Sequence, residues 1–165
     1  MRDSIDTERI RVLSKNDEVN GSYVLYWMQA SQRVEWNHAL KHAISAANER
    51  RMPLVVFFGI TPDYPEANAR HYAFMIQGLI EVERALADRG VKLVVQLVSP
   101  PEGAARLAKD AALVVVDRGY TRIQRQWRSW LARETRKPVL QVESDVVVPV
   151  ELAYPKEAYS AAVLR

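Results

Sequence analysis

Histidine is the first candidate for chemistry in this sequence, because an imidazole can act as a base or hold a metal. His38 and His42 are four residues apart, so a helix would place both on one face, a spacing that suits a metal site. Zinc proteases with this spacing have a glutamate after the first histidine, where this chain has Ala39. We therefore expect a solvated or partly buried histidine pair and predict no metal site.

Nucleophilic chemistry is not indicated either. The chain has no cysteine, which excludes disulfides, thiolate nucleophiles and cysteine-ligated metal clusters. Ser31 and Ser99 lie in predicted loops, but neither has the glycine pattern of a nucleophile elbow around it. We expect Ser31 to cap the following helix, with Glu35 in the first turn, where a carboxylate complements the helix dipole. No catalytic residue is predicted in this chain.

A glycine-rich phosphate-binding turn is also missing. The first apolar run, residues 23–28, leads into Gln-Ala-Ser-Gln-Arg at 29–33, and none of the six glycines forms a GxGxxG or GxxxxGK[ST] pattern. Side chains in such a turn obstruct the close approach of a pyrophosphate to the backbone. Dinucleotide and P-loop binding are therefore not expected.

These residues are positioned by short apolar runs that alternate with segments of helical periodicity. One such segment places Trp36, Ala39, Leu40, Ala43, Ile44 and Ala47 on a single face. The alternation predicts an α/β fold, a Rossmann-like, doubly wound, five-stranded parallel sheet with helices on both faces. The predicted strands are residues 23–28, 53–60, 91–98, 112–116 and 139–142.

Ligands of such sheets bind at the carboxyl ends of the strands, near the switch in strand order. The segments that follow the predicted strands are therefore the places where a site is expected: residues 29–33, 59–68, 99–102, 117–121 and 143–145.

An arginine-rich stretch, residues 118–136, contains Trp127 and Trp130 and has the composition of a nucleic-acid surface. Ile123 and Leu131 share one helical face with the two tryptophans. We therefore favour an amphipathic helix with its indoles on the sheet and its guanidinium groups in water. The net charge of +3 is too small to imply a nucleic-acid partner by itself.

The composition suits one compact domain, since 165 residues with 48% hydrophobic side chains can bury a single core. Residues 1–11 are charged throughout, unlike an export signal, and no segment approaches the roughly 20 apolar residues that span a bilayer. We expect a cytoplasmic protein without a membrane partner.

Four longer blocks are more informative than the periodicity. They read YVLYWMQASQRVEWNHAL at 23–40, PLVVFFGITPDYPEANARHYAFM at 53–75, VVVDRGYTRIQRQWR at 114–128 and QVESDVVVPVE at 141–151. In this order they resemble the N-terminal region of microbial class II cyclobutane pyrimidine dimer DNA photolyases, within the photolyase/cryptochrome family. The resemblance extends over nearly the whole chain.

The resemblance implies a flavoenzyme, a deoxyribodipyrimidine photo-lyase, that splits pyrimidine dimers in damaged DNA by light-driven electron transfer from FAD. Residues 1–145 would be its N-terminal α/β domain, and residues 146–165 the truncated start of an interdomain linker. The helical domain that holds FAD and the lesion in that family is absent here, so the chain alone is predicted to be inactive in repair.

In that family the α/β domain can hold a light-harvesting antenna pigment, a deazaflavin or a folate. A planar pigment needs an apolar slot with a few polar groups at its edge. The chemistry and positions of strand-end residues suggest that Met28 and Phe58 line the ring, while His71 and Met75 close the slot. Gln29, Gln32, Asp117 and Arg118 are the candidates for its polar edge. Ordinary core packing is the alternative for Met28, Phe58 and Met75.

Two other functions remain open at this stage. A cryptochrome-type photoreceptor shares the fold and would leave DNA lesions intact. A free-standing nucleotide-binding module of the stress-protein kind shares the parallel sheet and would bind adenine nucleotides without a pigment. In the isolated domain, the surface that normally meets the helical domain should be exposed, which predicts a weak dimer or higher homo-oligomer.

Overall fold

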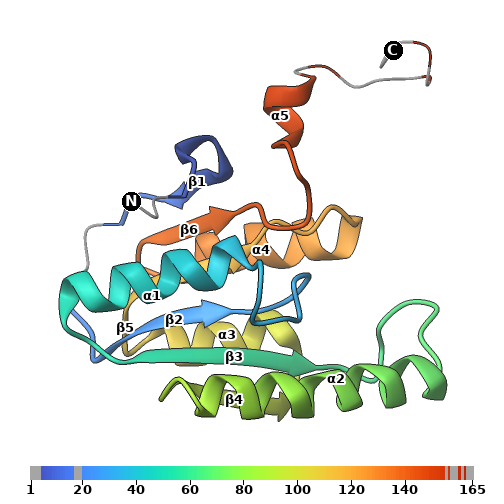
Figure 1. Ribbon diagram of the computed structural model, residues 1–165, viewed down its shortest axis with the longest axis horizontal. Helices are drawn as coiled ribbons and strands as arrows, with labels where there is room; N and C mark the ends of the chain where they lie inside the picture. Colours follow the sequence, from blue (N-terminus) through green and yellow to red (C-terminus); the bar gives the residue numbers. More distant parts are fainter. Residues whose placement is uncertain (1–4, 17–19, 155, 157–159, 161, 163–165) are drawn as a thin grey trace.

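A six-stranded sheet forms the centre of the computed structural model, which describes residues 5–16, 20–154, 156, 160 and 162 (Figure 1). The spatial order of the strands is β1-β6-β5-β2-β3-β4. Strands β2 to β6 are parallel, and β1 runs antiparallel to β6. The strands are β1 (Ile10–Ser14), β2 (Tyr23–Trp27), β3 (Leu54–Ile60), β4 (Lys92–Leu97), β5 (Ala111–Asp117) and β6 (Val139–Val142).

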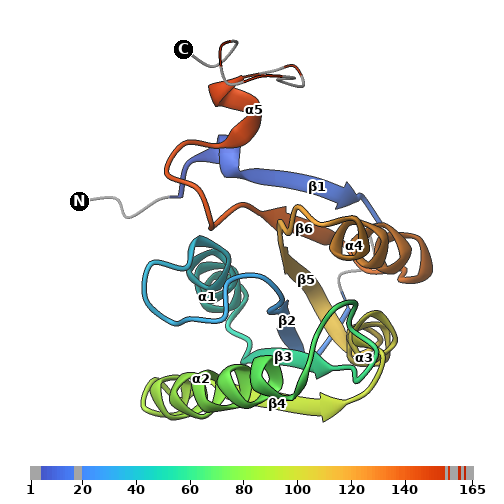
Figure 2. The same cartoon turned by 90° about the vertical axis from the view of Figure 1, so that its right-hand side faces the viewer.

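Helices cover both faces of this sheet (Figure 2). α1 (His38–Arg50) and α2 (Ala69–Ala87) pack on one face, and α3 (Pro100–Ala108) and α4 (Arg122–Glu134) on the other. Two short elements lie outside the layers, η1 (Thr7–Arg9) and α5 (Val150–Ala153). The predicted α/β class, with a doubly wound sheet between helical layers, is confirmed.

Alternation along β2 divides the core into its two layers. Val24 and Tyr26 pack toward α1 and α2, whereas Leu25 and Trp27 pack toward α3 and α4, because successive strand side chains point to opposite faces. Every residue of β5 is buried, as expected for a parallel strand with helices on both sides.

The sixth strand, β1, was not predicted. β1 pairs only with β6 at the edge of the sheet and is partly exposed. Its sequence IRVLS therefore lacks the long apolar run that marked the other strands. Ile10 lies opposite Val142 in this antiparallel pair. A segment of this kind owes its strand conformation to its partner more than to its own composition.

The expected start of the first helix was wrong. α1 begins at His38, and its cap is Asn37, whose side chain accepts a hydrogen bond from the Leu40 amide. Trp36, predicted on the buried face, precedes the helix with a positive φ of 53° and is 88% exposed. Ser31 does not cap the helix, and Glu35 pairs with Arg89 instead of lying in the first turn.

The interpretation of the arginine-rich segment is confirmed for its tryptophans and wrong for one arginine. Trp127 and Trp130 are half-buried and pack against the core between the sheet and helices α3 and α4. Arg128 is not in water: it is only 7% exposed and donates to Gln141 Oε1 and to the Gly119 carbonyl. Burial lowers the pKa of Arg128 to about 10, so its guanidinium stays charged at neutral pH.

The predicted linker, residues 146–165, is described only in part. Of these, residues 155, 157–159, 161 and 163–165 lie outside the described part, and α5 lies in the rest. Among the helices that the structure describes, none combines the length and the apolar character that crossing a membrane requires.

Candidate functional site

A cavity of about 620 Å³ opens at the carboxyl ends of β2 and β3. Its walls come from the ends of these strands, the loop between β3 and α2, the first turns of α2 and the start of α4. This size lies within the usual range for small-molecule sites. The lining includes Trp27, Met28, Gln29, Gln32, Phe58, Thr61, Tyr64, His71, Met75, Gln124 and Trp127.

The structure brings most of the predicted site residues together at this cavity. Those that line it are Met28, Gln29, Gln32, Phe58, His71 and Met75. Met28 and Phe58 also belong to the core that packs on α1 and α2, so core packing, the alternative considered from the sequence, is observed at two residues that also line the cavity. Asp117 and Arg118 are not in the lining, because their side chains bind groups of the protein itself.

Side-chain contacts hold the rim of the cavity in place. The Tyr72 hydroxyl donates to the Thr61 carbonyl at 2.7 Å, which ties the β3–α2 loop to α2. The rings of Tyr64 and Trp127 meet edge to face with centroids 6.1 Å apart, which ties the same loop to α4. His71 Nδ1 accepts from the Asn68 amide at 3.0 Å, so in the neutral ring Nε2 carries the proton.

Three buried polar atoms at the cavity have no hydrogen-bond partner. They are Trp27 Nε1, Gln29 Nε2 and Gln29 Oε1, and among the described residues these are the buried side-chain nitrogens and oxygens left without one. Gln29 is only 8% exposed and Trp27 is fully buried. An unpartnered buried polar group is costly and rare, so three at one cavity indicate a ligand with complementary groups.

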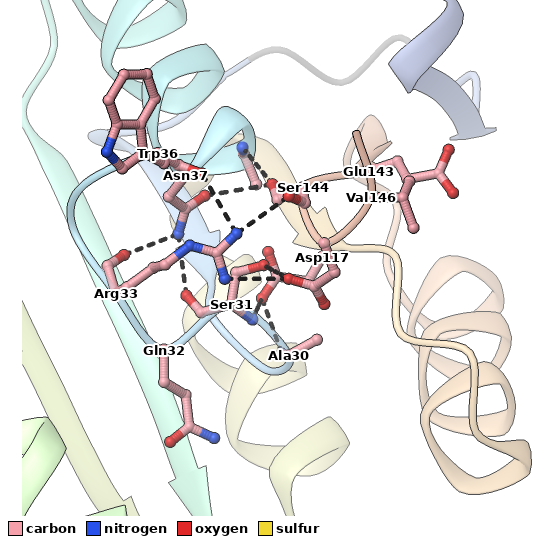
Figure 3. Close-up of polar contacts among 12 residues, drawn as sticks. Ala30, Ser31, Gln32, Arg33, Trp36, Asn37, Asp117, Glu143, Ser144 and Val146 are labelled. Carbon is pink, nitrogen blue, oxygen red and sulfur yellow. Dashed lines mark hydrogen bonds and ion pairs between the residues drawn. The ribbon is translucent and has the colours of Figure 1, made fainter. Parts of the chain in front are cut away.

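The loop that presents Gln29 is organised by Asp117 at the end of β5 (Figure 3). One carboxylate oxygen accepts from the backbone amides of Gln29, Ala30 and Ser31 at 2.8, 2.9 and 3.0 Å. The other oxygen accepts from the Tyr26 hydroxyl at 2.7 Å. Asp117 therefore fixes the backbone of Gln29, a residue that lines the cavity.

Asn37 and Ser144 extend this network to β6 and α1. Asn37 Nδ2 donates to Tyr26 Oη and to the Ser31 carbonyl, each at 3.0 Å. Ser144 Oγ donates to Asn37 Oδ1 and accepts from the Ala39 amide. The segment between β2 and α1 is thus bonded to residues more than 100 positions away.

The protonation of the network follows from its burial. Burial raises the pKa of the Asp117 carboxyl, against its hydrogen bonds, which favour the carboxylate. Burial, and then the Asp117 charge, raise the pKa of Tyr26 well above its usual value. Tyr26 consequently remains a hydroxyl donor to Asp117 at neutral pH.

The switch in strand order lies between β2 and β5, because β3 and β4 extend the sheet to one side of β2, and β5 and β6 to the other. Nucleotide-binding folds bind their anion at such a point, on exposed backbone amides. Here the amides of residues 29–31 already bind the Asp117 carboxylate. These amides are therefore not free to bind a phosphate.

Arg118 belongs to a second cluster, which was not expected from the sequence. Arg118 pairs with Glu143 at 3.3 Å and with Glu151 at 3.1 Å, and the Tyr120 hydroxyl donates to Glu143 at 2.5 Å. The Glu143 side chain is fully buried, and burial together with this carboxylate raises the pKa of Tyr120. Arg9 donates to the carbonyls of residues 143, 146 and 147, so the cluster fastens the C-terminal segment to the sheet.

Trp27, Tyr64 and Trp127 are further site residues that were not predicted from the sequence. Tyr64 lies in one of the strand-end loops where a site was expected. Trp127 was expected to pack on the sheet, and Trp27 was only part of the first predicted strand. Within the described residues, no group of three or more histidines and carboxylates is placed to hold a metal. Burial lowers the pKa values of His38 and His42.

The parallel sheet, its two helical layers and a strand-end cavity without a phosphate loop define a Rossmann-like α/β domain with a candidate small-molecule site. The family model described as DNA photolyase matches residues 24–165. The chain belongs to the DNA photolyase family.

Several curated relatives of the chain are called deoxyribodipyrimidine photo-lyase. The protein of Methanothermobacter thermautotrophicus is 51% identical over 98% of this chain and 36% of its own length. The protein of Arabidopsis thaliana is 28% identical over 98% of this chain and 34% of its own. The chain thus spans about a third of the length of the curated relatives it matches.

Solved structures share the fold at low sequence identity. A universal stress protein in complex with cAMP aligns with 74% of this chain and 98% of its own, at 16% identity and a TM-score of 0.54. A universal stress protein from Pseudomonas aeruginosa aligns with 82% of this chain and 52% of its own, at 15% identity and a TM-score of 0.55. At this identity the likeness concerns the fold alone.

Proposed function

We propose that this chain is the antenna domain of a class II cyclobutane pyrimidine dimer photolyase and binds a planar light-harvesting pigment in the strand-end cavity. The observation that supports this most directly is the set of unpartnered buried atoms on Trp27 and Gln29. The bound pigment would absorb light and pass its excitation to a second chromophore without bond chemistry.

The cavity residues fit a ring with a lactam edge. A carboxamide has one acceptor and two donors, so Gln29 can both accept from a ring N–H and donate to the adjacent carbonyl. The indole of Trp27 supplies one further donor. Met28 and Phe58 supply apolar contact at the strand ends, and Met75 does so from α2. Both a deazaflavin and a folate pterin have such an edge.

The repair reaction belongs to the proposal for the longer protein. The curated relatives are about three times as long as this chain, so the FAD site and the contacts with the lesion would lie in a helical domain beyond it. We propose that residues 1–145 form the antenna domain and that residues 146–165 begin the linker to that helical partner. This chain alone is then expected to show no repair of damaged DNA.

Substitution of Gln29 by leucine tests the pigment site. The leucine keeps the size of the side chain and removes two hydrogen bonds of about 1 kcal/mol each, so affinity should fall by about 10- to 100-fold. The measurement is an absorbance titration of the purified chain with a deazariboflavin and, separately, with a methenyl folate. We expect saturable binding of one of them with a shift of its absorption band.

The matched control is Gln77→Leu, an exposed glutamine on α2 outside the cavity, which should leave affinity unchanged. Equal affinity of the Gln29→Leu variant and the unchanged chain would refute the role of the amide. Binding of ATP but neither pigment would favour a nucleotide module, although Asp117 opposes this by occupying the loop amides. Intact pyrimidine dimers after illumination of the longer protein with FAD would favour a photoreceptor.

We also propose that the isolated chain self-associates through an apolar band on α2 and the edge strand β4. The second side of β4 is open, which leaves backbone groups free to pair with another copy. A single Leu97→Lys substitution should move the equilibrium toward monomer in sedimentation experiments at increasing concentration, because a charge would enter the contact. The exposed side chains are Phe74, Ile76, Ile80, Val95 and Leu97.

Val147→Lys is the control for self-association, since Val147 is 92% exposed and lies between β6 and α5, outside the α2 and β4 band. It should leave the oligomeric state as it is. A monomer at every concentration, or an equal effect of both substitutions, would contradict the assignment to β4.

A further inference from the structure

One face of α4 carries only arginine, glutamine and serine side chains. They are either positively charged or neutral, and all of them can donate hydrogen bonds. Arg122, Arg125, Gln126, Ser129 and Arg133 line a single surface depression and are all exposed. Their spacing of three, four, seven and eleven residues from Arg122 keeps them on one side of a helix. Glu134, the acidic residue of α4, lies about a third of a turn away from this direction.

The three arginines of this face are not neutralised within the described part of the chain. Arg122, Arg125 and Arg133 have no ion pair and no side-chain hydrogen bond to another described residue. Arg118 and Arg128, in the same part of the sequence, have protein partners instead. The segment therefore contains arginines that stabilise the fold and arginines whose donors are available to a partner.

The dimensions of the face suit a nucleic-acid backbone. Arg122 and Arg133 are eleven residues apart, which is about 16 Å along a helix axis. DNA presents a phosphate about every 3.4 Å per strand, so this length spans several phosphates. Arginine binds phosphate through two parallel hydrogen bonds, and serine and glutamine add neutral donors of the kind that contact the backbone.

The inward packing of the tryptophans favours a duplex over a single strand. Single-stranded nucleic acids are bound by stacking their bases on exposed aromatic rings. Trp127 and Trp130 lie in the core layer of α4 and are not on the arginine face. The face thus has phosphate-binding groups without a stacking platform.

We propose that the arginine face of α4 binds the phosphate backbone of duplex DNA without reading its sequence. The choice of DNA as the polyanion rests on the proposed function. The same helix contributes Gln124 and Trp127 to the cavity wall, so α4 would separate the pigment from the DNA backbone. Figure 2 shows α4 on the same side of the sheet as α3.

The test is fluorescence anisotropy of a labelled, undamaged duplex titrated with the chain at several salt concentrations. Replacing Arg122, Arg125 and Arg133 together by glutamine should weaken binding at low salt by more than tenfold. It should also reduce the slope of log K against log salt by about 0.9 for each phosphate that the variant no longer neutralises. The control replaces the exposed Arg50, Arg70 and Arg84 by glutamine, with the same loss of charge and at most a twofold effect.

Three results would overturn the inference: equal effects of the two triple substitutions, tighter binding to a single strand than to the duplex, or tighter binding to anionic vesicles than to DNA. The deazariboflavin and folate titrations on the same variants distinguish this inference from the proposed function. If the unchanged chain binds neither pigment, the proposed function fails, while the salt slopes still decide the role of α4. If pigment binding persists and the slopes do not differ, only the role of α4 fails.

Discussion

Asp117→Ala is expected to lower the free energy of unfolding by about 3–5 kcal/mol, the cost of removing one partner of a buried charged network. The substitution leaves the amides of residues 29–31 and the Tyr26 hydroxyl without their acceptor in the interior. Urea denaturation followed by tryptophan fluorescence measures the change. Pigment affinity should fall as well, because the loop that presents Gln29 loses its anchor.

Asp110→Ala is the matched control, at the opposite end of the same strand. Asp110 is exposed, and the hydrogen bond that its backbone carbonyl accepts from the Ser22 amide does not need the side chain. This variant should change the stability by less than about 0.5 kcal/mol. Asp117→Asn, which keeps one carbonyl oxygen, should lie between the two. Equal stability of the Asp117→Ala and Asp110→Ala variants would show that the network does not hold the loop.

Gly21→Ala is expected to destabilise the fold by about 3 kcal/mol, at the upper end of typical overpacking. A Cβ at this position would lie 2.2 Å from the Ala112 nitrogen and 2.3 Å from the Ala111 carbonyl carbon. These are backbone atoms of the central strand β5, so the added methyl group cannot be accommodated by a side-chain rotation. The strand pair of β2 and β5 would have to separate at its start.

Gly78→Ala provides a control of opposite sign. Gly78 lies inside α2, and a Cβ there would have no neighbour within 4 Å. Alanine restricts the unfolded chain and favours the helix, so the variant should be more stable by about 0.5–1 kcal/mol. The two thermal midpoints should therefore move in opposite directions. A neutral Gly21→Ala would mean that β2 and β5 do not approach as closely as described.

The cavity is bounded by a loop whose backbone is fixed by hydrogen bonds to Asp117. Gln29 lies where a strand ends, and its backbone is bonded to Asp117 from the neighbouring strand. A residue whose backbone is already fixed loses less entropy when it binds a ligand, which is the advantage of a preorganised site. The same bonds place a carboxylate on the loop amides, so one set of hydrogen bonds both fixes the loop at the proposed pigment site and engages amides that could otherwise bind a phosphate.

Much of the fold was predictable because buried helix and strand faces require apolar residues at regular intervals in the sequence. The all-apolar run of β5 and the regular spacing of Leu79, Val82 and Leu86 in α2 each depend on nearby residues only. The same reasoning failed for β1, whose pairing partner is more than 120 residues away. It also failed at the start of α1, where Ser31 was expected as the cap and Asn37 is the cap in the structure.

The sequence by itself determined the class of fold, the family resemblance and the strand ends at which a site would form. The tertiary structure alone decided which polar side chains hydrogen-bond to other protein groups and which are left without a partner at the cavity. Asp117 and Gln29 are both polar residues after a strand, yet the carboxylate is satisfied internally and the amide is left unpartnered. The physical reason is that a hydrogen bond depends on where two atoms meet, and here those atoms are 86 to 91 residues apart in the chain.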